Sequence, residues 1–196
     1  MKFQKPFSLF RWVFDSFWGW LLGIILILVL SSFFDSIGIE HLQFYVGVGV
    51  ITGISLAQFR HMRHYFQLTI SWMIWSIVSF SLPFIVIDGI KYSDLYPFSQ
   101  NSLVYSVLIG TLSLSMTQYY GIKKSKSKPL PWFIFSMAGW SCAGIATFAL
   151  EYTPLIIENK LIVFIVNVLL ILSGGVFIGI FTGMAAKKLL TAIEKE

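Results

Sequence analysis

Six long apolar stretches, separated by short polar connections, make up most of this 196-residue chain. A helix needs about 20 mostly apolar residues to cross about 30 Å of hydrocarbon, because it rises 1.5 Å per residue. Stretches close to that length or longer lie at residues 17–34, 42–59, 68–87, 103–120, 132–150 and 161–186. They predict an all-α polytopic membrane protein with six transmembrane helices in a single domain, 1–196.

Composition excludes the two main alternatives to a membrane protein, a soluble globular domain and a disordered chain. Hydrophobic residues make up 57% of the chain and charged residues only 12%, against roughly 25% charged in soluble domains. A soluble protein of this size keeps too many residues at its surface to hide so much apolar area. Disordered chains are polar and poor in aromatic residues, which does not fit a mean hydropathy of +0.80.

The segment before the first stretch mixes aromatic and charged residues. Phe7, Phe10 and Trp12 alternate there with Lys5 and Arg11. Aromatic rings and cationic side chains both find partners at the headgroup level of a membrane. We therefore expect a short interfacial helix over residues 3–20, leading into an uncleaved first span.

Basic residues are unevenly shared between the two sides of the predicted membrane. Alternate connections and both termini carry twelve of the 14, and only Lys91 and Lys160 fall on the other side. By the positive-inside rule this predicts cytoplasmic N- and C-termini. The net charge of +5 is thus explained by topology and anionic lipid headgroups, and nucleic acid is not needed as a partner. The candidate headgroup contacts are Arg60, Arg63, Lys123 and Lys124.

Sliding the chain by 60 residues reveals an internal similarity. The shift aligns identical residues at eight positions, among them Tyr45 with Tyr105, Ser55 with Ser115, Gln58 with Gln118, and Trp72 with Trp132. The match predicts two helical hairpins of the same orientation, over residues 45–88 and 105–148. Residues 161–188 form a possible partial third copy, because Gly179 and Gly183 there echo Gly49 and Gly53.

The shared pattern is a glycine-rich helix ending in Gln-aromatic-x-x-aliphatic-(Arg/Lys), followed after the turn by Trp. It resembles a repeat of small multi-pass bacterial membrane proteins of unknown function. The resemblance implies a bacterial cytoplasmic (inner) membrane location and brings no established activity.

A few polar and aromatic residues within the spans are candidates for helix contacts or for a ligand. Gln58 and Gln118 fall where descending helices leave the hydrocarbon, and Trp72 and Trp132 fall where ascending helices enter it. Asn167 is the deepest amide, and it predicts an interhelical hydrogen bond or, alternatively, a ligand contact.

Glycines at four-residue spacing are the other interior signal. Gly49 and Gly53 share one helix face, as do Gly175, Gly179 and Gly183. Such faces allow close helix approach. We expect them to pack within the chain, with a dimer interface as the alternative.

Catalytic and metal-binding signatures are missing. The sequence has one cysteine, Cys142, and no charged residue deep in any predicted span. His61 and His64 stand three apart, yet a zinc site needs further ligands and His41 falls on the other side. Neither a nucleophile elbow nor a phosphate loop is present. We therefore expect no enzyme, no cofactor and no metal, and interpret the histidine pair as a basic turn.

Three functions remain. The first is a non-enzymatic structural or accessory subunit acting through helix and lipid contacts, with a membrane-protein partner or a second copy. The second is a small transporter or substrate-binding module for a neutral or aromatic solute. It requires an open cavity lined by residues such as Trp75, Ser79, Tyr105, Trp140 and Asn167. The third is an ion pore with a continuous hydroxyl-lined path.

Overall fold

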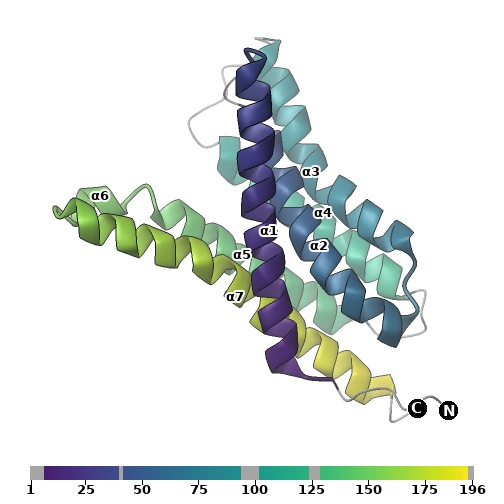
Figure 1. Ribbon diagram of the computed structural model, residues 1–196. Coiled ribbons are helices and arrows are strands. Elements are labelled where there is room, and N and C mark those ends of the chain that lie inside the picture. The colour runs from purple at the N-terminus through teal and green to yellow at the C-terminus, as the bar shows by residue number, and fades with distance from the viewer. Residues whose placement is uncertain (1–6, 40–41, 94–101, 124–128, 194–196) are drawn as a thin grey trace.

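Helices make up nearly all of the computed structural model, which describes residues 7–39, 42–93, 102–123 and 129–193 (Figure 1). Six are long and α6 is a single turn. In chain order they are α1 Leu9–Ser36, α2 Phe44–Phe66, α3 Ile70–Tyr92, α4 Ser102–Lys123, α5 Leu130–Ala149, α6 Thr153–Ile156 and α7 Lys160–Ile193. The prediction of an all-α fold is confirmed for the described residues.

The six long helices form a closed ring. Each packs mainly against two others, in the order α1, α2, α3, α4, α5, α7 and back to α1. The first and last helices are therefore neighbours. We call the end where α1 begins and α7 finishes the terminal end, and the opposite end, where α1 finishes and α2 begins, the distal end (Figure 1).

Four helices are long and apolar enough to cross a membrane: α1, α3, α5 and α7. The other two, α2 and α4, coincide with predicted spans at residues 42–59 and 103–120 but are less apolar, and are rich in Gly, Ser, Thr and Gln. Burial explains the difference in α2, where 11 of 23 residues are buried, against 5 of 28 in α1. A helix that is largely covered by protein needs less apolar surface than one that faces lipid.

The predicted interfacial helix over residues 3–20 is not a separate element. From Leu9 onward these residues form the first turns of α1, which runs unbroken to Ser36; residues 3–6 lie outside the described part. Ser8 caps the helix by accepting a hydrogen bond from the Arg11 N–H at 3.4 Å. Trp12 and Ser16 turn into the protein interior, so this segment is part of the ring and does not lie flat.

Glycines set the close approach of α1 to α2. A Cβ atom on Gly19 would lie 2.6 Å from the Gly53 carbonyl oxygen, and one on Gly23 would lie 2.7 Å from the Val50 Cα. On the other flank, a Cβ on Gly179 of α7 would lie 2.9 Å from the Val13 Cα. Both predicted glycine faces thus pack within the chain, and both pack against α1.

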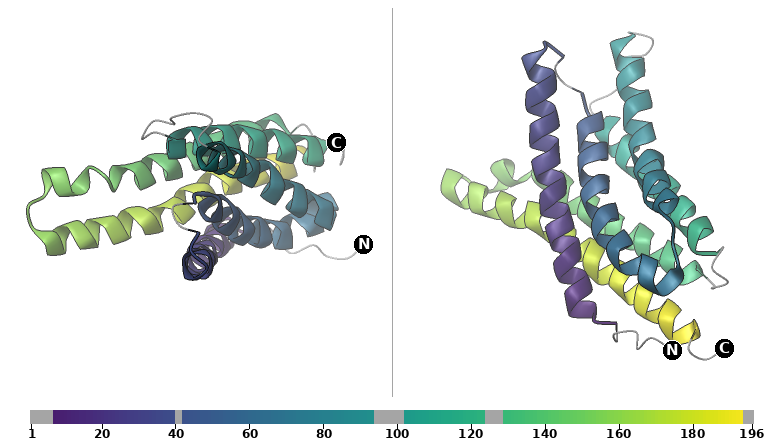
Figure 2. Two further views of the ribbon diagram at one scale, coloured as in Figure 1. Left: turned by 90° about the horizontal axis from the view of Figure 1, so that it is seen from above. Right: turned by 45° about the vertical axis from the view of Figure 1, so that its right-hand side comes forward.

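The chain between α5 and α7 leans away from the rest of the ring. We call this part the arm: α6, the end of α5 and residues 160–173 of α7 (Figure 2). None of residues 160–173 is buried, whereas Gly174, Gly175, Ile178 and Thr182 beyond them are. This part of α7 is therefore sparsely enclosed, as is the distal part of α1, where none of residues 24–36 is buried either.

Candidate functional site

A layer of buried polar side chains crosses the ring between two hydrophobic clusters. The terminal cluster contains Trp12, Trp72 and Trp132, and the distal cluster contains Trp20, Phe80 and Trp140. Along each of the six long helices, the polar residues fall between the members of these clusters. We call this set the polar layer; its members, each at most 2% exposed, are Ser16, Ser55, Gln58, Ser76, Ser115, Gln118, Ser136 and Thr182.

Gln118 links three helices within this layer. Its side-chain oxygen accepts a hydrogen bond from Trp132 Nε1 of α5 at 3.0 Å, and its Nε2 donates to Ser76 Oγ of α3 at 3.3 Å. Beside it, Ser115 Oγ donates to Ser136 Oγ at 3.2 Å. Buried polar groups that are paired in this way fix one relative placement of their helices.

Thr182 of α7 is the corresponding junction on the opposite side of the ring. Its hydroxyl oxygen accepts from Trp12 Nε1 of α1 at 3.0 Å and from Gln58 Nε2 of α2 at 3.3 Å. The hydroxyl donates in turn to the Ile178 carbonyl oxygen at 2.6 Å. These bonds tie the last helix to the first two.

The third tryptophan of the terminal cluster has a different environment. Trp72 is 5% exposed, and its Nε1 is buried with no hydrogen-bond partner among the described residues. The same edge of its ring lies against Gly121 of α4, where any Cβ would collide with Trp72 Cδ1. Of four residues predicted to share one level, Gln58, Gln118 and Trp132 are therefore paired, and Trp72 is not.

Asn167 does not join these residues. It lies on the arm, where the Thr153 hydroxyl of α6 donates to its Oδ1 at 2.6 Å. This bond joins Asn167 to a one-turn helix only 14 residues away. The choice between a helix contact and a ligand contact for this amide stays a prediction.

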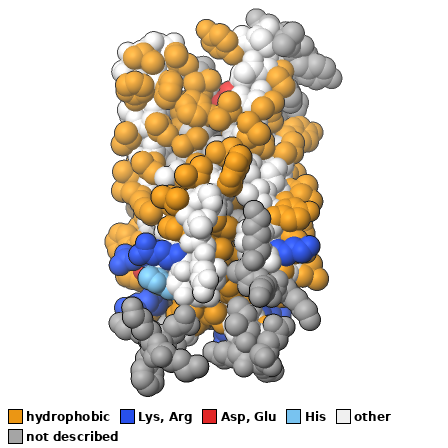
Figure 3. Space-filling view, turned by 90° about the vertical axis from the view of Figure 1, so that its right-hand side faces the viewer, with side chains coloured by type: hydrophobic (Ala, Val, Ile, Leu, Met, Phe, Trp, Pro, Cys, Tyr) orange, Lys and Arg blue, Asp and Glu red, His pale blue; other side chains and the backbone are white. Residues whose placement is uncertain are grey.

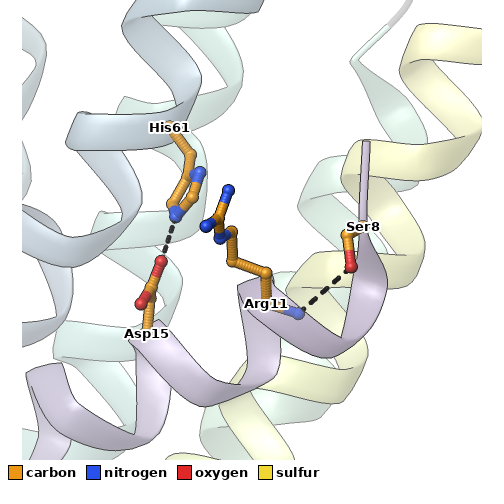
Figure 4. A network of polar contacts seen from close by, with 4 residues as sticks. All are labelled: Ser8, Arg11, Asp15 and His61. Carbon is orange, nitrogen blue, oxygen red and sulfur yellow. Dashed lines mark hydrogen bonds and ion pairs between the residues drawn. The ribbon is translucent and has the colours of Figure 1, made fainter. Parts of the chain in front are cut away.

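An aspartate–histidine pair borders the polar layer at the terminal end. His61 Nε2 of α2 bonds Asp15 Oδ2 of α1, and Arg11 extends towards the same imidazole (Figure 4). The His61 ring also lies 5.7 Å from the Trp12 ring, measured between centroids. The pair is partly exposed, with 22% of the His61 and 35% of the Asp15 side chain accessible.

The predicted lipid-facing cations are at the surface. Arg60, Arg63 and Lys123 are exposed, and Lys124 lies outside the described residues. On the face drawn in Figure 3, Lys and Arg side chains gather at one level below a surface that is mostly hydrophobic. Such a border between apolar and basic surface is typical of a membrane interface.

The described interior holds an apolar cavity of about 60 Å³ in the distal half, lined by five helices. Trp20, Phe80 and Trp140 line it on the side of the polar layer. Ligand sites for drug-sized molecules occupy about 300–1,000 Å³, so this cavity is too small for such a solute. Of the five residues predicted to line a solute cavity, Trp140 does so; Trp75 and Tyr105 are exposed, at 61% and 49%.

Ser79 and Asn167 were also predicted to line a solute cavity. Both are partly buried, and neither lines the apolar cavity in the distal half. No group of three or more His, Cys, Asp or Glu side chains that could hold a metal occurs within the described residues. The chemistry that the layer offers is hydrogen bonding, with the Asp15–His61 contact at its border.

Sequence reasoning missed part of this site. The 60-residue register that pairs Trp72 with Trp132 also pairs Trp12 with Trp72, and Ser16 with Ser76 and Ser136. Trp20, Phe80 and Trp140 follow at the same interval. This signal was present in the sequence but lay within the segment assigned to an interfacial helix. Thr182 carried no comparable signal.

Comparison of the chain with models of protein families, with curated proteins and with solved structures finds no match.

Proposed function

We propose that this protein is a non-enzymatic accessory subunit of a bacterial membrane complex, acting through helix and lipid contacts. In this proposal all six long helices cross the bilayer and the terminal end faces the cytoplasm. The observation that carries it is the arm. Its side of α7 presents Leu161, Phe164 and Leu169 to the surroundings at 66%, 64% and 61% exposure, and Leu155 and Ile156 of α6 are 78% and 80% exposed.

The rest of the ring supports this proposal, because its interior has the features of a structural core. The polar layer is closed on both sides by aromatic residues, with Trp12 and Trp132 in edge contact at 6.1 Å and Phe80 and Trp140 at 4.6 Å between centroids. The bonded amides of Gln58 and Gln118 and the hydroxyl of Thr182 hold the helices in place, while Ser55 Oγ has no partner among the described residues. The bonded groups favour a scaffold over a pore. An arm that leans out of such a scaffold offers helix faces to a neighbouring transmembrane helix.

Site-specific photo-crosslinking in the native membrane tests this proposal. A photoreactive phenylalanine analogue at Phe164 or Leu169 should give one discrete protein adduct, either with a partner or with a differently tagged second copy. The matched control is Ile74 on α3, which is 49% exposed on a face away from the arm and should give lipid adducts alone. Lipid adducts alone at all three positions would refute the accessory-subunit role.

The second candidate, a solute-binding module, has one observation in its favour: the apolar cavity lined by Trp20, Phe80 and Trp140. It requires that cavity to expand several-fold. Quenching of tryptophan fluorescence by an aromatic solute, lost in Trp140→Ala, would support this candidate over the first.

A further inference from the structure

The surface carries a groove of about 490 Å³ at the terminal end, separate from the polar layer. It lies between the α2–α3 turn and the last turns of α4. Hydroxyl groups line it from both sides, contributed by Thr69, Ser71, Thr117 and Tyr120. Trp75 and Tyr120, 61% and 60% exposed, stand at its edges. Polar groups framed by exposed aromatic rings are typical of a site at the membrane–water interface.

The N-terminus of α3 opens into this groove. Thr69 occupies the N-cap position but makes no capping hydrogen bond, because its hydroxyl pairs with Ser71 Oγ at 2.6 Å. The Trp72 N–H donates to the Thr69 carbonyl oxygen at 3.0 Å, and the N–H groups of Ile70 and Ser71 are left without a side-chain cap. Such groups, together with the positive end of the helix dipole, favour an anion.

Trp72 supplies a second, independent observation. It lines the groove together with Gly121, and its indole N–H has no acceptor among the described residues. The two tryptophans at the same 60-residue interval, Trp12 and Trp132, both donate to an internal acceptor. Unlike those two, Trp72 is an unpaired, buried donor in the wall of the groove, with its Nε1 edge against Gly121.

No charged residue lines the groove, but basic residues lie close to it along the chain. Arg63 near the end of α2 and Lys123 at the end of α4 are exposed at the same end of the molecule. Asp15 is the one acidic residue of the described part at the terminal end, and it is already paired with His61. A groove with several donors in a basic setting fits the oxygens of a phosphate group.

We propose that this groove binds the phosphate of an anionic phospholipid from the cytoplasmic leaflet. The inference rests on the bilayer placement given under the proposed function. Lipid is the committed source because aromatic side chains at the edges place the groove at the interface. The acyl chains would then lie along the exposed apolar residues of α3, such as Ile74 and Val78.

Native mass spectrometry of the protein released from mixed micelles tests the proposal. Dioleoyl phosphatidylglycerol and dioleoyl phosphatidylcholine serve as probes, and inorganic phosphate as competitor. We expect one phosphatidylglycerol to remain bound where phosphatidylcholine is lost. The substitution Ser71→Glu should lower that occupancy about tenfold, because it places a negative charge in the groove. Ser71 is exposed and a glutamate in a first helical turn is favourable, so the fold is retained.

Thr191→Glu on α7 is the matched control. It adds the same charge to an exposed position at the terminal end, on a helix that does not pack against α3, and should leave occupancy unchanged. Tyr120→Phe, which removes one exposed hydroxyl, should lower occupancy severalfold and serves as a second probe of the groove.

Several results would overturn the inference. Equal losses in S71E and T191E would mean that binding is diffuse, and equal retention of phosphatidylcholine would mean that headgroup charge is not recognised. Displacement of the lipid by inorganic phosphate would assign the groove to a free anion. Failure of the arm to crosslink, with lipid retained, would refute the accessory role alone; a chain that does not partition into membranes would refute both proposals.

Discussion

Three tryptophans at equal intervals occupy similar buried positions, yet their indole groups differ in hydrogen bonding. Trp12 and Trp132 donate to Thr182 and Gln118, whereas Trp72 Nε1 is buried without an acceptor in the described structure. A buried donor without a partner costs about 1–3 kcal/mol relative to a paired one. The effect of this difference on stability can be measured, because the tryptophans with a bonded indole serve as controls for Trp72.

The prediction compares Trp72→Phe with Trp132→Phe in lipid-free detergent. Both variants lose the same side-chain volume. Trp132→Phe also leaves the buried oxygen of Gln118 without its indole donor, whereas Trp72→Phe removes an unpaired donor. We expect Trp132→Phe to be the less stable by about 1–2 kcal/mol, measured as the free energy of unfolding. Equal losses, or a reversed order, would show that Trp72 is in fact paired.

Residue types and spacing identified Gln58, Gln118, Trp72 and Trp132 as candidates for helix contacts or a ligand at the border of the hydrocarbon, and all four are buried in the structure. Residue types and spacing were not enough to predict the partners. Gln58 bonds Thr182, 124 residues away, because the last helix closes the ring against the first two. A hydrogen-bond partner that depends on ring closure leaves no local trace in the sequence.

At the scale of single helices, α1 shows how an element can be misassigned. Its first turns carry the mixture of rings and charges that is typical of an interfacial helix, and Phe10 and Phe14 are indeed exposed, at 82% and 50%. Every fourth residue from Trp12 to Trp20 is buried instead. This helical periodicity identifies a packed face, and it outweighs composition as evidence for where the segment lies.

The α1–α2 seam supplies the prediction at this scale. Gly53→Ala should destabilise the protein by about 1–3 kcal/mol or more, because its Cβ would collide with the Gly19 carbonyl oxygen, a backbone atom that cannot rotate away. The control is Gly89→Ala in α3, where a Cβ would meet nothing within 4 Å. That change should raise stability by about 0.5–1 kcal/mol through helix propensity. Thermal unfolding of the two variants in the same detergent tests this prediction. If Gly53→Ala does not lower stability, the close contact between α1 and α2 is contradicted.

At the scale of the whole molecule, the helical content agrees with the sequence prediction, whereas the closure of the six helices into a ring was not predicted. Apolar length was sufficient to locate every long helix, because each of them overlaps a predicted span. It could not show that α7 returns to α1, since this depends on glycine contacts between distant segments. Nor could it show that the arm leans outward. The parallel hairpin repeats remain a prediction.

The orientation of the ring yields the last prediction. Basic residues cluster at the terminal end, and the positive-inside rule therefore predicts that this end faces the cytoplasm. Cys142 is the sole cysteine, so Cys142→Ala gives a background for single labels. In intact bacterial cells, a membrane-impermeant maleimide should label Ser36→Cys, exposed at the distal end, and should reach Thr191→Cys only after the membrane is opened. Labelling in the opposite order would invert the topology and move the proposed phosphate groove to the outer leaflet, whereas labelling of both positions in intact cells would contradict a chain that spans the membrane.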